Sequence, residues 1–193
     1  IALPGMPNLH SHAFQHGMAG LTETRGPGSD SFWTWREAMY RFIDVMTPDD
    51  MQAIAAQAYA GMLENGFTHV AEFHYVHHDT HGRAYENIGE LSERIAAASA
   101  EAGIGLTLLP VFYAHAGFGG LAPTHGQRRF INTLDQFEKI LAAATTAVRH
   151  LPDGHIGIAP HSLRAATPDE LRHLVEIMPD APFHMHIAEQ TKE

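Results

Sequence analysis

The sequence predicts an α/β fold of the (β/α)8 TIM-barrel type, of which this chain supplies about the first five strands and four helices. Short apolar runs alternate with segments of helical periodicity, which is typical of parallel βα units. A doubly wound sheet has the same alternation, but neither Gly-x-Gly-x-x-Gly nor Gly-Lys-Ser/Thr is present. Polar residues also gather directly after the strands, where a barrel has its active site.

The first half of the chain contains the expected first strand, a long loop and the first helix. The strand ends at Met6-Pro7-Asn8-Leu9 and leads into His10-Ser11-His12, and the loop covers residues 13–45 with a turn at residues 26–28. The helix, residues 48–65, begins after a threonine N-cap, Thr47, with Pro48 in its first turn. Gly66 fits its left-handed end.

The remaining elements continue the same alternation. Strands are expected at residues 68–73, 104–113, 155–160 and 183–188, and helices at residues 86–102, 134–150 and 168–178. The run at 104–113 is almost unbroken in its apolar character, as expected of a strand that is buried on both faces. Three histidines after the second strand, His77, His78 and His81, lie in a polar turn, and we expect them to be solvated.

Composition excludes several classes of protein. The formal net charge is -10 with only 12 Lys plus Arg, which argues against binding to nucleic acid or to an anionic membrane surface. The absence of cysteine excludes disulfides, thiolate metal sites and cysteine nucleophiles, and it is compatible with the cytoplasmic location that we expect. Because the chain begins at Ile1 and ends just after an apolar run, we interpret it as an excised segment of a longer protein.

Two histidines at the end of the first strand are candidate metal ligands. His10 and His12 are two residues apart, so that both side chains project from the same face of an extended strand. Two imidazoles on one face can bind a borderline metal such as zinc. The alternative is a hydrogen-bonded pair at a polar strand end.

A second candidate cluster follows the fifth expected strand. His186 and Glu189 are three residues apart across a transition from strand to loop. One can bind a metal while the other moves the proton of the activated water. We expect the neighbouring His184 to be structural.

Five longer motifs resemble one family. They are PGMPNLHSHAFQ at residues 4–15, FWTWR at 32–36, AEFHY at 71–75, HAGFGG at 115–120 and IAPHSLR at 158–164. Together with the two histidine clusters, they resemble the formimidoylglutamate deiminases of the amidohydrolase superfamily, and the resemblance covers essentially the whole chain. It implies that residues 1–193 are the N-terminal portion of a zinc-dependent barrel domain. It also implies deimination of N-formimino-L-glutamate in histidine degradation by an enzyme that is usually a homodimer.

The resemblance also implies roles for individual residues. His10, His12 and His186 become ligands of one divalent metal ion, preferably zinc, and Glu189 becomes the catalytic proton shuttle. The substrate contacts are Gln15, Tyr75, His161 and Arg164. An arginine side chain suits the role implied for Arg164, because the substrate has two carboxylates and a guanidinium binds a carboxylate in a bidentate manner. Arg36 is either a second carboxylate partner or a structural arginine stacked on the tryptophans beside it.

The expected site is mononuclear and incomplete. Strand 155–160 carries no lysine or acid that could bridge two metals. The further histidine and aspartate that the family requires would follow Glu193, so the isolated segment is expected to be inactive. Two alternatives remain open, namely a related deaminase that acts on a purine, pyrimidine or triazine ring, and a non-enzymatic metal-binding module.

Overall fold

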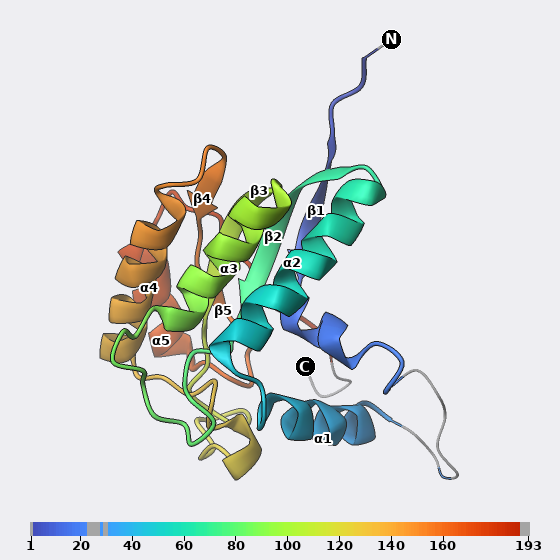
Figure 1. Cartoon of the computed structure of the whole chain (residues 1–193). Coiled ribbons are helices and arrows are strands. Elements are labelled where there is room, and N and C mark those ends of the chain that lie inside the picture. The colour runs from blue at the N-terminus through green and yellow to red at the C-terminus, as the bar shows by residue number, and fades with distance from the viewer. Residues whose placement is uncertain (1, 23–27, 29–30, 190–193) are drawn as a thin grey trace.

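The fold is a parallel sheet with helices packed on it, in the order expected of the first units of a barrel (Figure 1). A computed structural model describes residues 2–22, 28 and 31–189. The strands are β1 (Met6–Ser11), β2 (Phe67–His74), β3 (Gly105–Phe112), β4 (Gly154–Ile156) and β5 (Ala159–Pro160). Their order is β1-β2-β3-β4, with β5 also paired to β3, and every pair is parallel. The predicted α/β barrel class is therefore confirmed.

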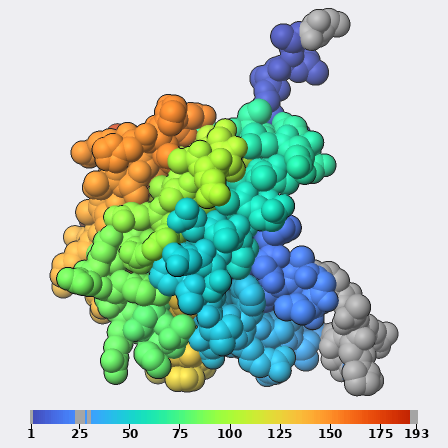
Figure 2. All heavy atoms as spheres, in the orientation of Figure 1, coloured from blue at the N-terminus to red at the C-terminus, as the bar shows by residue number. Residues whose placement is uncertain are grey.

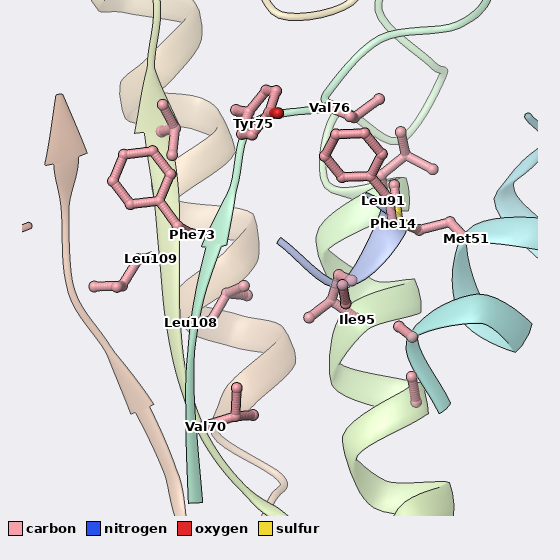
Figure 3. Packing of buried hydrophobic residues seen from close by; sticks show 14 of the residues in the cluster. Phe14, Met51, Val70, Phe73, Tyr75, Val76, Leu91, Ile95, Leu108 and Leu109 are labelled. Atoms are coloured by element: carbon pink, nitrogen blue, oxygen red, sulfur yellow. The ribbon is translucent and has the colours of Figure 1, made fainter. Parts of the chain in front are cut away.

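The helices that follow the strands cover the sheet. They are α2 (Pro48–Glu64), α3 (Glu90–Ala102), α4 (Leu134–Val148) and α5 (Pro168–Ile177). α2, α3 and α4 lie side by side, and residues 2–5 project from the packed body (Figure 2). Buried side chains such as Phe14, Met51, Leu91 and Ile95 pack between the strands and the helices (Figure 3). This core holds the carboxyl ends of the strands together at one edge.

The ends of α2 follow the predicted signals. Thr47 caps the helix by accepting a hydrogen bond from the backbone N–H of Asp50, whose side chain accepts from the backbone N–H of Thr47 in return. Gly66, just after the helix, has a φ of 88°, a left-handed conformation that favours glycine. The predicted start of this helix is therefore confirmed, and its last residue is Glu64, one residue before the predicted end.

The prediction of a loop over residues 13–45 is wrong in part, because this segment contains two helices. These are the short 3-10 helix η1 (Ala13–Met18) and the longer α1 (Phe32–Ile43). Ser31 caps α1, and apolar residues recur at helical spacing as Phe32, Trp35, Met39 and Ile43. The predicted turn at residues 26–28 lies outside the described residues, apart from position 28.

The fourth and fifth predicted strands differ from what forms. The predicted strand at residues 155–160 is interrupted at Gly157. Residues 155 and 156 are the end of β4, and residues 159 and 160 form β5. A Cβ on Gly157 would lie only 2.5 Å from both the Leu109 side chain and the Pro182 carbonyl oxygen, so this close approach requires glycine. Residues 183–188 form only isolated parallel bridges at Phe183 and His186. Among the described residues this segment pairs on one side only, which leaves its ladder incomplete.

The prediction that His77 and His78 are solvated is wrong. Both are buried, with exposed fractions of 2% and 1%, and burial lowers the pKa of each imidazole. The Nε2 atoms lie 2.9 Å from the Val111 carbonyl oxygen for His77 and 2.7 Å from the Ile131 carbonyl oxygen for His78. A neutral imidazole can be buried when it donates such a hydrogen bond, and these two stabilise the loop after β2. His81 is exposed, as predicted.

Helix α3 begins at Glu90, four residues later than predicted, after a turn in which Glu90 N–H donates to the Asn87 carbonyl oxygen. None of the helices in the described ranges is long and apolar enough to cross a membrane.

Candidate active site

Three imidazoles from opposite ends of the sequence meet at the carboxyl edge of the sheet. His10 lies in β1, His12 directly follows it, and His186 is bridged to Ser162 after β5. One ring nitrogen of each lies within 4.8 Å of the other two, and the Nε2 atoms of His10 and His12 are 3.0 Å apart. The predicted convergence of these three residues is therefore what the structure shows.

Backbone carbonyl groups orient two of the three rings. The Nδ1 atom of His12 lies 3.0 Å from the Phe73 carbonyl oxygen, and that of His186 lies 3.2 Å from the His161 carbonyl oxygen. An Nδ1–H that donates to a carbonyl leaves the lone pair on Nε2 for a metal. The buried Phe73 ring packs against the cluster, with its centroid 5.2 Å from that of His12 and 4.5 Å from that of His186.

The electrostatics of the cluster favour neutral imidazoles. Burial is the main cause that lowers the pKa of His12 to about 3. The hydrogen bond with the Phe73 carbonyl opposes the shift, and the neighbouring His10 and His186 add to it. Burial also lowers the pKa of His10, and His186 and His184 act in the same direction. Neutral imidazoles are the form that binds metal, so these residues fit one divalent ion such as zinc.

A cavity of about 350 Å³ lies beside the histidines, which is the size of a small-molecule site. It is lined by every predicted site residue except His10, namely His12, Gln15, Arg36, Tyr75, His161, Arg164, His186 and Glu189. The structure thus brings the predicted residues together, while their roles remain predictions.

Three of the expected substrate contacts form the inner part of the cavity. Gln15 Nε2 donates to the Tyr75 hydroxyl group across 2.9 Å, and the Tyr75 hydroxyl donates to Met39 Sδ at 3.4 Å. Burial raises the pKa of Tyr75, so its hydroxyl remains a donor. The His161 imidazole is half-buried; desolvation lowers its pKa well below the usual value, and its Nδ1 lies 3.1 Å from Ser162 Oγ. These polar groups can orient a ligand.

Two predicted site residues pair with each other, which the sequence did not predict. Arg164 donates to the Glu189 carboxylate, joining the loop after β5 to the segment after His186. The side chains are 14% and 28% exposed respectively, so the pair lies at the rim of the cavity and not in its floor. Arg36 lies on α1 with its guanidinium carbon 4.4 Å from the centroid of the Trp33 ring, in a cation–π contact.

Sequence reasoning missed one wall of the cavity. The apolar lining comes mostly from α1 and two aromatic residues near it, namely Phe32, Trp35, Met39 and Tyr40 of α1 with Tyr113 and Phe130. The available signal was the helical spacing after Ser31, which the prediction of a long loop overlooked.

The chain is similar to known proteins along its whole length. Residues 1–193 match the model of the amidohydrolase family. The chain is 53% identical to formimidoylglutamate deiminase from Pseudomonas aeruginosa over 193 residues, which is 99% of this chain and 42% of that protein. A crystal structure of an amidohydrolase from Brucella melitensis has a TM-score of 0.94 at 57% identity, covering 98% of this chain and 42% of that one.

A more distant structure shares the fold. It is an atrazine chlorohydrolase mutant from Arthrobacter aurescens complexed with zinc and atraton, with a TM-score of 0.75 at 17% identity over 97% of this chain and 41% of that one. The chain thus spans about two fifths of the length of these relatives. Since the family model extends over every residue, the chain belongs to the amidohydrolase family.

Proposed function

We propose that the protein containing this chain hydrolyses N-formimino-L-glutamate to N-formyl-L-glutamate and ammonia in histidine degradation. The observation that carries the proposal is the convergence of three imidazoles beside a cavity that also holds two arginines. The 53% identity to a formimidoylglutamate deiminase supports the choice of substrate.

His10, His12 and His186 would hold the metal, and their nitrogen donors suit zinc, which the distant atrazine chlorohydrolase structure contains. When bound, the ion is a Lewis acid that makes water nucleophilic near neutral pH. The carbonyl groups of Phe73 and His161 keep the imidazoles of His12 and His186 in the orientation that binding requires.

Glu189 is the proposed proton carrier. Its carboxylate lines the same cavity as His12 and His186, and Arg164 holds it in place. It accepts a proton from the water that attacks the carbon of the protonated formimino group and gives that proton to the departing nitrogen, and the remaining hydroxyl proton is released as the formyl C=O bond forms. Ammonia, and not the far more basic amide ion, then leaves.

The two arginines give the cavity its selectivity for an acidic ligand. A mostly aromatic wall offers little to a carboxylate, so Arg164 and Arg36 are the groups that would bind the two carboxylates of the substrate. A guanidinium can bind Glu189 and a substrate carboxylate through different N–H groups. Gln15, Tyr75 and His161 would fix the formimino end by hydrogen bonds.

A second candidate is deamination of a purine, pyrimidine or triazine ring. The observation in its favour is the aromatic wall with the Gln15 amide beside it, since rings stack on aromatic side chains and pair with amides.

The deciding experiment measures metal content and ammonia release with the purified full-length protein. We expect stoichiometric zinc and ammonia from N-formimino-L-glutamate, with activity lost on chelation and restored by zinc. Ammonia from guanine, cytosine or a triazine, and none from N-formimino-L-glutamate, would replace the proposal by the second candidate. Bound zinc without turnover of any of these compounds would support a non-enzymatic metal-binding module in place of both enzyme candidates.

Replacing Arg164 by alanine should raise the KM for N-formimino-L-glutamate by about 10–100-fold, because a charge-assisted bidentate contact contributes roughly 1.5–3 kcal/mol. Steady-state kinetics of the full-length protein measure this effect. Arg172→Ala is the matched control, since Arg172 lies on the exposed surface of α5 and pairs with Asp169. An unchanged KM in Arg164→Ala would remove Arg164 from the substrate site.

A further inference from the structure

One buried carboxylate lies behind the histidine cluster and has no part in the mechanism above. Glu72 is in β2 and is only 1% exposed. Side chains alternate along a strand, so Glu72 points to the opposite face from its neighbour Phe73, whose ring packs on the histidines. A buried carboxylate is costly unless hydrogen bonds compensate for its lost hydration, so its contacts are informative.

The Glu72 carboxylate accepts a hydrogen bond from the residue that follows a candidate metal ligand. The backbone N–H of Ala13 donates to Glu72 Oε1 across 2.7 Å, and Ala13 directly follows His12. Burial raises the pKa of Glu72 to about 6, while the hydrogen bond from the Ala13 N–H opposes that rise. This hydrogen bond stabilises the ionised carboxylate in its buried place.

The Ala13 N–H is the first N–H group of η1, which lacks a cap from its own N-cap residue. His12 holds the N-cap position, but its side chain makes no capping hydrogen bond, because the ring is directed at Phe73 and His10. Glu72 therefore satisfies, from a neighbouring strand, one of the N–H groups at the start of η1 that have no partner within the helix.

Two adjacent residues of β2 thus fix His12 on two sides. The carbonyl oxygen of Phe73 lies 3.0 Å from the His12 ring, and the carboxylate of Glu72 fixes the peptide group that links His12 to Ala13. We propose that Glu72 is a positioning residue. It holds the His12 imidazole where a metal ion binds. The proposal rests on the proposed metal site, and it assigns Glu72 no contact with metal or substrate.

The test compares Glu72→Met with Glu72→Gln in the full-length protein. Methionine keeps the length of the side chain and removes both oxygens, whereas glutamine keeps one oxygen as an acceptor for Ala13. We expect Glu72→Met to weaken zinc binding by about 10–100-fold, as for other groups that orient metal ligands. Glu72→Gln should stay within about threefold of the wild type. Competition with a chelating dye, well below the unfolding temperature, measures the dissociation constants.

A second measurement needs no metal. Hydrogen–deuterium exchange of the metal-free protein should be faster over residues 11–18 in Glu72→Met and unchanged in Glu72→Gln. Ser99→Ala is the matched control for stability, because Ser99 Oγ is buried and donates to the Ile104 carbonyl oxygen, away from the histidines. It should lower the unfolding temperature and leave zinc binding unchanged.

Zinc affinity in Glu72→Met equal to that of the wild type, or in Glu72→Gln as low as in Glu72→Met, would overturn the positioning role. A wild-type protein that binds no zinc would instead overturn the proposed metal site itself, so that the two failures are distinguishable.

Discussion

Glutamine in place of Glu189 is expected to lower kcat for N-formimino-L-glutamate by about 10²–10⁴-fold, the range typical of losing a general acid–base group. Glutamine has nearly the same shape, and its carbonyl oxygen can still accept from Arg164, but it cannot carry the proton from water to the departing nitrogen. The fall should appear in kcat with zinc content unchanged, measured by steady-state kinetics and metal analysis of the full-length protein.

Glu138→Gln is the control for this substitution. Glu138 lies on α4, pairs with His173 and is about half exposed, so the same chemical change there should leave kcat unaltered. If Glu189→Gln kept kcat within about threefold of the wild type, Glu189 would not be the proton carrier. If it lost its zinc, the residue would be needed for metal binding and not only for proton transfer.

The parts of the fold that follow from the sequence are those with local causes. The apolar run at residues 104–113 predicts β3 because a strand buried on both faces needs apolar side chains throughout. Thr47 and Gly66 delimit α2 because capping and the left-handed turn act within a few residues. The spacing of His10 and His12 determines their shared face in the same way.

The parts that do not follow from the sequence depend on contacts between distant segments. His77 and His78 look solvated in a polar stretch, and only the carbonyl groups of Val111 and Ile131, more than thirty residues away, make their burial favourable. The pairing of Arg164 with Glu189 likewise depends on how residues 183–189 return beside β5. No local pattern specifies such partners.

The position of α1 depends on a buried arginine. This helix forms a wall of the cavity and replaces part of the predicted loop. Arg129 is fully buried, and its guanidinium donates to the carbonyl oxygens of Ile43, Met46 and His78, the last two at 2.9 and 2.8 Å. Ile43 is the last residue of α1, where carbonyl groups lack partners within the helix. A cation there satisfies those carbonyls and interacts favourably with the helix dipole.

Arg129→Met should therefore destabilise the protein strongly, by about 3 kcal/mol or more. It removes the guanidinium donor from these three carbonyl groups, of which that of Ile43 also accepts from the Met46 N–H. The loss costs roughly 1–3 kcal/mol for each carbonyl left unpaired, offset in part because a buried charge is removed. In the full-length protein the unfolding temperature should fall by about 5 °C or more, and the KM for substrate should rise as α1 loosens. Arg172→Met is the control, since the largely exposed Arg172 pairs with the exposed Asp169 on α5 and should contribute about 1 kcal/mol or less. Equal shifts in the two variants would contradict the assignment, because only Arg129 supplies donors that water cannot replace at the end of α1.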